Sequence, residues 1–508
     1  MTFNNRQSTR NFPSLVGTVF CSVWLMTVGG WCGSVRANAP GDVRTEYHPG
    51  RILIQARPGV RGESLASLHG TRKVKVLISI RGQGALQLVP LEPGESVPVA
   101  IKRYEESGWV VFAEPDYARH LALTPNDPKY TEGTLWGLNN YGQGGGTPDA
   151  DIDAPEAWDI RTSASNIVVA VLDTGIRRTH EDLAANVWTN STLGGFGWNA
   201  LAGTTSPADD EGHGSLVSGV LGAVGNNGKG VTGVAWSVQI MAGKCFNSQR
   251  LGYDSDIIVC IDFARTNGAK VINASLGAYA YSQSLSNAIF EARQAGIIFV
   301  ASSGNDGNDI DANPYYPAGF DIDNIVSVGF TTRDDTADPR SNYGARNVDL
   351  MAPGTSMYST FFAADNSYLG GSFLYGSSLA APYVTGAFAL ALAKFPGETH
   401  QQIIQRVLGG VDRFPSLSGK CVTGGRLNLR NALSAPILLS PLAATGVHPF
   451  QFRVSSSPNR SCIVESSPDL ATWTPVFTNT TAGDGTFDYA DTDSGGALRR
   501  FYRGVSAQ

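Results

Sequence analysis

The stretch Asn166-Ile-Val-Val-Ala-Val-Leu172 decides the fold that this sequence predicts. Six of its seven residues are apolar and three of them are valine, which is typical of a strand buried on both faces of a sheet. The polar residues Asp173 and Thr174 follow at once. The stretch therefore predicts a buried strand with the carboxylate of Asp173 at its C-terminal end.

Strand-like and helical segments alternate downstream of this strand. We predict strands at 237–244, 270–273 and 296–301, and helices at 213–224, 255–267, 284–295 and 378–394. Such alternation predicts the α/β class, with a doubly wound parallel sheet covered by helices on both faces. Ligands of these sheets bind at the carboxyl ends of the strands, where Asp173 is placed.

Three short motifs supply an acid, a base and a nucleophile in that order. They are Asp173-Thr-Gly, Gly-His213-Gly-Ser and Gly-Ser-Ser378-Leu-Ala-Ala-Pro. A serine hydroxyl is a weak nucleophile until a neighbouring base accepts its proton, and His213 could be that base. Asp173 could hold the imidazole in one tautomer and stabilise its charged form. The order Asp, His, Ser along the chain is the subtilisin order.

Each of these motifs resembles the matching motif of the subtilisin-like (subtilase) serine proteases, and the resemblance covers roughly residues 125–435. It implies a serine endopeptidase that cleaves protein or peptide substrates through an acyl-enzyme. Within Ala301-Ser-Ser-Gly-Asn305-Asp-Gly307, it implies that Asn305 donates to the oxyanion. The implied substrate-binding residues are Ser275, Leu276, Gly277, Ser303 and Gly304. Tyr315 would narrow the pocket for the substrate side chain.

A second serine competes with Ser378 for the role of nucleophile. Gly354-Thr-Ser356-Met spells the subtilase serine motif more literally than the residues around Ser378 do. However, Ser356 precedes a strand-like segment, whereas Ser378 begins an apolar helix whose N-terminus could stabilise an oxyanion. We therefore expect Ser378 to be the nucleophile.

Three positions depart from the subtilase pattern, namely Leu216, Leu379 and Tyr383. They leave the subfamily and the details of the cleft open. A catalytically silent subtilase fold that serves only for binding is the alternative to an active enzyme. The presence of all three triad residues and Asn305 favours the enzyme.

The resemblance also implies a structural calcium ion. Asp182 follows Asp173 at the distance seen in subtilases that carry such an ion, and Asn226 and Asn227 belong to a loop that resembles the family's binding loop. Oxygen ligands of this kind suit Ca²⁺. A plain turn without a metal is the alternative for this glycine-rich loop.

The net charge and the N-terminal segment indicate an exported protein without a nucleic-acid partner. The chain has 508 residues and a formal net charge of −6, so nothing indicates binding to nucleic acid or to an anionic membrane. Residues 1–39 have a basic start, a short apolar run and an Ala37-Asn-Ala39 cleavage motif, so we predict a signal peptide and a secreted, extracellular protein. A membrane anchor is the alternative reading of this segment.

Four cysteines follow the predicted signal peptide, namely Cys245, Cys260, Cys421 and Cys462. An even number in an exported chain permits disulfides. The placement of Cys245 at a strand end and Cys260 on the next helix makes these two the favoured pair. Free buried thiols are the alternative.

Two further segments flank the predicted catalytic domain at 124–436. Residues 40–123 form an α+β unit that resembles the inhibitory propeptide of subtilases, with an unrelated binding domain as the alternative. Such a propeptide would be removed by self-cleavage between His120 and Pro125, after Leu121 or Leu123. Residues 440–508 contain short strand-like runs that predict a small β-sandwich. Its ligand could be a cell surface or a polymer.

Overall fold

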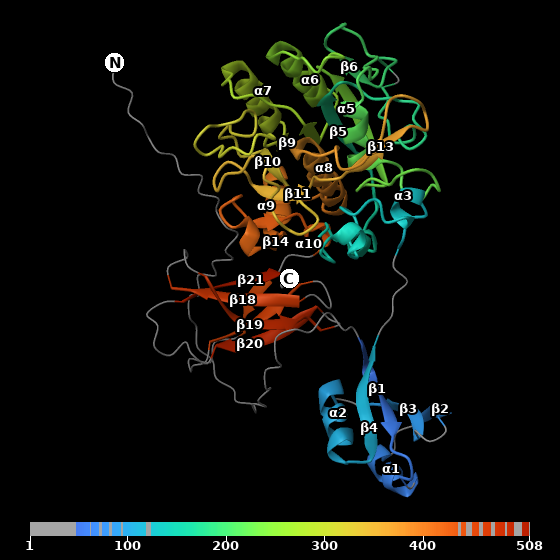
Figure 1. Cartoon of the computed structure of the whole chain (residues 1–508). Coiled ribbons are helices and arrows are strands. Elements are labelled where there is room, and N and C mark those ends of the chain that lie inside the picture. The colour runs from blue at the N-terminus through green and yellow to red at the C-terminus, as the bar shows by residue number, and fades with distance from the viewer. Residues whose placement is uncertain are drawn as a thin grey trace. The chain divides into compact units, whose positions relative to one another are not determined.

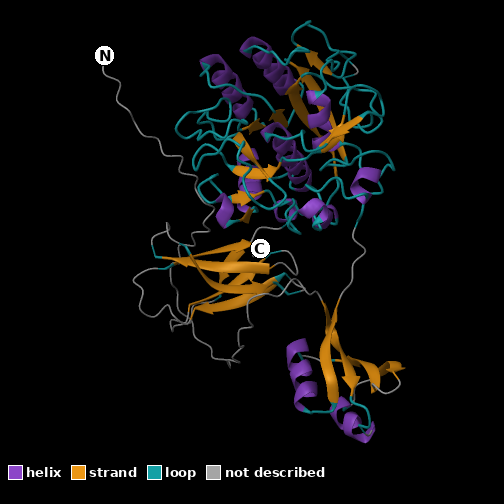
Figure 2. Cartoon of the chain, in the orientation of Figure 1, coloured by secondary structure: helices purple, strands orange, loops and turns teal. Residues whose placement is uncertain are grey.

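The computed structural model describes three separately folded parts of the chain (Figures 1 and 2). The described residues are 47–60, 62–70, 74–80, 84–92, 95–117, 123–190, 192–434, 438–442, 450–456, 461–468, 473–482, 485–491 and 500–506. The predicted signal peptide at 1–39 and the predicted cleavage window around residues 118–122 lie outside them. No helix among the described residues is long and apolar enough to cross a membrane.

The largest part, from Ala122 to Pro436, is built on a nine-stranded sheet with the order β14-β15-β11-β10-β9-β8-β5-β7-β6. Every neighbouring pair is parallel except β14 and β15 at one edge. The strands are β5 (Ser163–Asp173), β6 (Gly197–Asn199), β7 (Ser237–Lys244), β8 (Val271–Ala274), β9 (Ile298–Ser302), β10 (Ile325–Thr331), β11 (Leu350–Pro353), β14 (Asp412–Arg413) and β15 (Gly425–Arg426).

Helices cover both faces of this sheet. On one face, α5 (His213–Gly222), α8 (Ser377–Lys394) and α9 (His400–Gly409) share a core with the sheet, and on the other α6 (Asp254–Thr266) and α7 (Gln283–Gln294) do so. β5 serves both cores, because successive side chains of a strand point to opposite faces. Val169 and Val171 lie in the first core, and Ala170 and Leu172 in the second. The predicted doubly wound α/β fold is therefore confirmed.

Short elements complete this part of the chain. They are α3 (Pro128–Thr131), α4 (Ala154–Trp158), α10 (Leu429–Leu433), the 3₁₀ turns η1 (Gln143–Gly145) and η2 (Pro415–Leu417), and the two-stranded sheet of β12 (Tyr358–Thr360) and β13 (Tyr368–Gly370). The sequence analysis did not predict strands β10, β14 and β15. β14 and β15 contain only two residues each, which is too short for a periodic pattern.

The N-terminal part is a four-stranded antiparallel sheet with two helices. The strand order is β2-β3-β1-β4, and Ile52, Ile54 and Tyr104 belong to its own hydrophobic core. Its elements are β1 (Tyr47–Ala56), α1 (Gly62–His69), β2 (Lys75–Ile80), β3 (Gly84–Pro90), α2 (Val97–Glu106) and β4 (Val110–Tyr117).

The C-terminal part contains two three-stranded antiparallel sheets with the orders β16-β17-β20 and β19-β18-β21. Phe452, Val454, Cys462 and Val464, from both sheets, form one small core. The strands are β16 (Leu438–Pro441), β17 (Phe450–Ser455), β18 (Ser461–Ser467), β19 (Thr474–Thr480), β20 (Thr486–Asp491) and β21 (Phe501–Ser506).

The four cysteines are buried and none of them forms a disulfide in this structure, so the favoured Cys245–Cys260 disulfide is not present. The two side chains are nevertheless neighbours. Burial raises the pKa of the Cys245 thiol well above its usual value, and a hydrogen bond with Cys260 adds to the rise. The structure therefore shows the alternative, in which Cys245 and Cys260 are buried thiols.

Candidate active site

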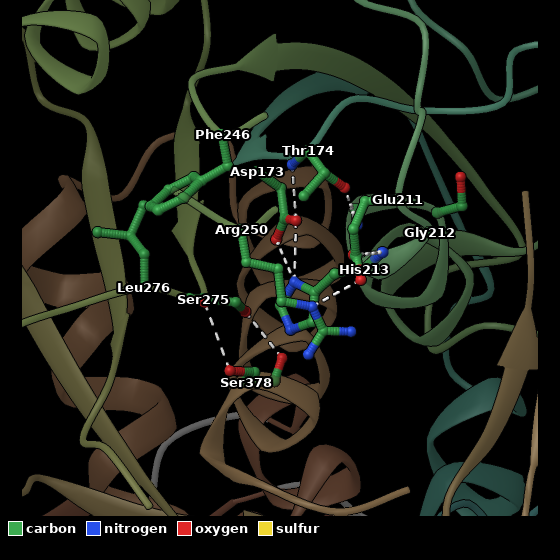
Figure 3. A network of polar contacts seen from close by, with 12 residues as sticks. Asp173, Thr174, Glu211, Gly212, His213, Phe246, Arg250, Ser275, Leu276 and Ser378 are labelled. Atoms are coloured by element: carbon green, nitrogen blue, oxygen red, sulfur yellow. Dashed lines mark hydrogen bonds and ion pairs between the residues drawn. The ribbon is translucent and has the colours of Figure 1, made fainter. Parts of the chain in front are cut away.

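Asp173 and His213 meet at the carboxyl edge of the sheet (Figure 3). Asp173 is the last residue of β5 and is almost fully buried, and His213 is the first residue of α5. Both carboxylate oxygens of Asp173 lie 2.9 Å from His213 Nδ1. Burial lowers the pKa of His213, but the charge and hydrogen bond of Asp173 outweigh burial, so the pKa is raised. Asp173 thus fixes which imidazole nitrogen faces away from it.

The loop before α5 is held in place by a second carboxylate, Asp209. Its Oδ1 accepts hydrogen bonds from the Thr174 hydroxyl (2.9 Å) and the Gly212 N–H (2.8 Å). Its Oδ2 accepts from the N–H (3.0 Å) and the hydroxyl (2.6 Å) of Ser215. Gly212 has a φ of 115°, which favours glycine. Asp209 therefore ties the residues around Asp173 to the residues around His213.

An ion pair that the sequence analysis missed lies next to His213. Glu211 Oε2 accepts a hydrogen bond from the backbone N–H of His213 (2.9 Å), and Glu211 Oε1 accepts one from Arg250 Nε (2.6 Å). Figure 3 shows the Arg250 side chain beside the imidazole. Arg250 opposes the protonation of His213 and Glu211 favours it. The sequence carried no signal for this pair, because the two residues are brought together only by the fold.

Ser378 is the second residue of α8 and lies on the side of His213 away from Asp173 (Figure 3). Its hydroxyl donates to the carbonyl oxygen of Ser275 at 3.4 Å rather than to His213. The carbonyl of Ser378 in turn accepts the Ser275 hydroxyl at 2.7 Å. That carbonyl lacks its helical donor because Pro382, four residues later, has no N–H. The Ser275 hydroxyl thus supplies the hydrogen bond that Pro382 cannot give to the Ser378 carbonyl.

Two donors converge near Ser378. The Oδ1 atom of Asn305 accepts hydrogen bonds from the backbone N–H (2.8 Å) and the hydroxyl (3.0 Å) of Ser377. This anchoring leaves the Nδ2 amide of Asn305 as a donor, and within the described part of the chain no acceptor is bonded to it. The backbone N–H of Ser378, the second residue of α8, is the other donor, because N–H groups at the start of a helix have no acceptor in a preceding turn.

The predicted substrate edge follows two neighbouring parallel strands, β8 and β9. After β8, Ser275 and Leu276 are buried and Gly277 is exposed. After β9, the Ser303 hydroxyl donates inward to the carbonyl of Asn342 (3.2 Å), so only its backbone can face a substrate. Gly304 comes next, with a φ of 102°. The five predicted substrate-binding residues thus lie in two adjacent segments beside Ser378.

Ser356 lies elsewhere. It stands between β11 and β12 with a φ of 51°, and it lines a surface cavity of about 410 Å³ together with Arg333 and Tyr358. No triad residue lines this cavity. The residues that line this cavity include no histidine, so the literal match of the Ser356 motif lacks the imidazole that a triad needs.

The predicted calcium loop is folded onto Asp182, which is fully buried. The Asp182 carboxylate accepts hydrogen bonds from Asn227 Nδ2 (2.9 Å), the Val231 N–H (2.9 Å) and the Tyr368 hydroxyl (2.8 Å). Asn226 points elsewhere, because its Oδ1 accepts the N–H of Asn126 (3.2 Å). Two of the three predicted ligands are thus in contact, and the third faces a different segment.

A second buried carboxylate, Asp127, faces the same loop and was missed by the sequence analysis. It accepts the N–H groups of Asn226 (2.7 Å) and Asn227 (3.3 Å). Burial raises its pKa, and the nearby charge of Asp182 adds to the rise. Among the described residues, neither carboxylate pairs with a lysine or arginine, and no three His, Cys, Asp or Glu side chains form a metal-binding cluster. Carboxylate and amide oxygens still fit a hard cation such as Ca²⁺.

Comparisons with known proteins identify the family of this chain. A model of the subtilase family matches residues 164–410. A thermophilic serine proteinase from Bacillus sp. (strain AK1) is 30% identical over 390 residues, which are 76% of this chain and 88% of the relative. Thermitase from Thermoactinomyces vulgaris is 32% identical over 310 residues, which are 61% of this chain and 99% of thermitase.

A solved structure shares the fold of the largest part. It is described as proteases from Pseudoalteromonas arctica PAMC 21717, and it matches with a TM-score of 0.51 and 30% identity over 61% of this chain and 98% of the other. Together with the relatives, this match establishes the fold and the reaction class. The chain therefore belongs to the subtilase family and is a subtilisin-like serine protease.

Proposed function

We propose that Asp173, His213 and Ser378 are the catalytic triad of this protease. The observation that carries the proposal is the double contact of the Asp173 carboxylate with His213 Nδ1, 2.9 Å from each oxygen, beside a serine at the N-terminus of α8. In the first step, the Ser378 oxygen attacks the peptide carbonyl carbon while its proton passes to His213 Nε2. His213 then gives that proton to the leaving amine, and the acyl group stays on the Ser378 oxygen. Water next attacks this ester while its proton passes to His213, and His213 returns the proton to the Ser378 oxygen as the acid leaves.

We propose that the Asn305 side-chain amide and the Ser378 N–H bind the oxyanion that forms on the substrate carbonyl. The Ser377 bonds fix the carbonyl end of Asn305, which supports this role, because a preorganised donor needs no rearrangement as charge develops. The hydroxyl of Ser378 bonds to Ser275 in the free enzyme. Catalytic hydrogen bonds often form fully only with substrate bound, so this geometry does not oppose the role.

We propose that an extended protein or peptide substrate pairs with the segment Ser275-Leu276-Gly277. The exposed Gly277 at the end of this segment supports pairing by strand addition, in which backbone groups give affinity and pockets for side chains give specificity. Ser303 and Gly304 line the facing side.

We propose that the enzyme is secreted as a zymogen. Residues 1–39 would be the signal peptide, 40–123 the inhibitory propeptide, 124–436 the catalytic domain and 440–508 a module for a cell-surface or polymer ligand. The independent core of the N-terminal part supports a separately folded inhibitor. Holding the linking segment in its own cleft makes its cleavage effectively intramolecular.

We propose that a structural calcium ion binds between Asp182 and Asp127, with the Asn227 amide close by. Two buried carboxylates that face one loop support this site, because unpaired buried charge is costly. A bound divalent cation would offset both charges and hold the loop on the N-terminal segment of the catalytic domain.

The triad proposal is tested by labelling with a fluorophosphonate, which reacts only with an activated serine. Ser378→Ala should abolish labelling, and the matched control Ser356→Ala should leave it intact. A silent subtilase fold that only binds would not be labelled in the wild type. Labelling that depends on Ser356 would overturn the assignment.

A further inference from the structure

Two glycines leave an opening between the segments that follow β8 and β9. The strands are parallel neighbours, with Ala274 paired to Ala301, so the segments after them run side by side. Gly277 and Gly304 carry no side chains that could close the space between these segments. The opening lies beside Ser378, because Ser275 is bonded to both the hydroxyl and the carbonyl of that serine.

The ring of Tyr315 occupies this opening. A Cβ atom placed on Gly277 would lie only 2.3 Å from Tyr315 Cε1 and 2.8 Å from Cζ. A Cβ atom placed on Gly304 would lie 3.3 Å from the same Cε1. The edge of the ring is therefore in contact with both glycines at once, and the absence of side chains there is what admits the ring.

The ring is held in this position by its neighbours. Tyr279 packs against it edge-on, with ring centroids 5.0 Å apart. The Tyr279 hydroxyl donates to Asp306 (2.7 Å) and accepts from Asn308 (2.7 Å), so this wall is itself fixed.

The backbone beside Tyr315 is also fixed. Tyr316 and Ala278 exchange two backbone hydrogen bonds, of 2.7 and 2.8 Å. These bonds join the segment that carries Tyr315 to the substrate edge. A substrate side chain would have to displace a ring that is supported from two sides.

We propose that Tyr315 closes the side-chain pocket for the substrate residue whose carbonyl is attacked, so that the enzyme cleaves after glycine, alanine or serine. This inference rests on the proposed triad and substrate edge. A substrate paired with residues 275–277 and attacked by Ser378 directs that side chain between the two glycine-bearing segments. A small side chain fits beside the Tyr315 ring, whereas leucine or phenylalanine meets it.

The closed pocket also changes the expected point of self-cleavage. The sequence between His120 and Pro125 is Leu121-Ala122-Leu123-Thr124. An open apolar pocket would favour cleavage after one of the two leucines. A pocket filled by Tyr315 favours cleavage after Ala122, which would make Leu123 the N-terminus of the mature enzyme.

The experiment measures kcat/KM of the mature enzyme, produced from the full chain, on peptides that differ only in the residue before the cleaved bond. Each extra methylene that meets a closed pocket costs about 10-fold or more. We expect the wild type to cleave after alanine at least ~100-fold faster than after phenylalanine. Tyr315→Ala should raise cleavage after phenylalanine by roughly 100-fold, and Tyr315→Phe should keep the wild-type preference because the ring remains.

A matched control removes a neighbouring ring that lies outside the opening. Tyr281 is 58% exposed and packs on Tyr316 and Phe320 instead. Tyr281→Ala should therefore keep the preference for small residues. Fluorophosphonate labelling of every variant reports the fraction of folded, active enzyme, so a misfolded Tyr315→Ala is recognised and the wild-type and Tyr315→Phe profiles decide the question.

The outcomes separate this inference from the proposed function. A labelled wild type that cleaves after leucine or phenylalanine as fast as after alanine refutes the role of Tyr315 and leaves the triad standing. A wild type that is neither labelled nor active on any peptide refutes the proposed function and this inference with it. Cleavage after Ala122, which leaves Leu123 as the N-terminus, supports the closed pocket. Cleavage after Leu121 or after Leu123 contradicts it.

Discussion

The Glu211–Arg250 pair should set the acid limit of activity through His213. His213 can act as a base only when it is neutral, so kcat/KM falls as the pH drops below its pKa. Burial lowers that pKa and Asp173 raises it, while among the smaller influences Arg250 lowers it and Glu211 raises it. The two members of this ion pair therefore shift the pKa of His213 in opposite directions.

The sizes of the two effects follow from exposure. The unscreened charge of Arg250 acts more strongly on the His213 pKa than that of Glu211, but the Arg250 side chain is 65% exposed and that of Glu211 is 13% exposed, so solvent and salt screen Arg250 more and reverse the order. Arg250→Gln should move the acid limb to higher pH by about 0.3 units, because it removes a positive charge near the imidazole. Glu211→Gln should move it to lower pH by about 0.5 to 1 unit.

The assay is the pH dependence of kcat/KM on one peptide at low and at high salt. Glutamine is the matched replacement because it keeps the size of glutamate and can still accept the His213 N–H bond. High salt should shrink the Arg250→Gln shift more than the Glu211→Gln shift. Shifts of the same sign, or two unchanged profiles, would refute the electrostatic role of the pair.

Three further results are expected. Asn305→Ala should lower kcat by about 10²- to 10³-fold with little change in KM, as for the subtilisin oxyanion residue from which that magnitude comes, and an unchanged kcat would remove Asn305 from the mechanism. Calcium chelation should lower the melting temperature of the wild type, because an ion bound only by the native state stabilises it, and Asp182→Asn should lose that response. Purified Ser378→Ala should accumulate with residues 40–123 attached, and its maturation at the wild-type bond without another protease would refute self-cleavage.

The sequence predicts best those elements whose pattern is local. β5 contains a continuous apolar run at residues 167–172, and the predicted strand at 237–244 coincides with β7. Helix α8 is apolar around its whole circumference, which is the pattern of a helix buried on all sides. The triad motifs were found because each couples a reactive residue to small neighbours that let the backbone approach closely.

Residues whose role depends on distant partners could not be assigned from the sequence. Asp127 and Asp182 lie far apart in the chain and meet only because the loop with Asn226 and Asn227 lies between them. Glu211 and Arg250 are exposed or loop residues with no motif of their own. The predicted Cys245–Cys260 disulfide is not formed, because the two thiols are neighbours but proximity does not decide the redox state of two buried thiols.

Tyr315 shows why a family motif does not fix specificity. Gly277 and Gly304 belong to motifs shared with subtilases, and glycines at these positions leave room for a substrate side chain. The same room admits a ring from another segment. The resemblance to subtilases implies that Tyr315 narrows the pocket, and the fold shows its ring in contact with both glycines. A reaction class can thus be read from a few reactive residues and their neighbours. The substrate preference depends on what fills the space between them, which the sequence around Ser275 does not contain.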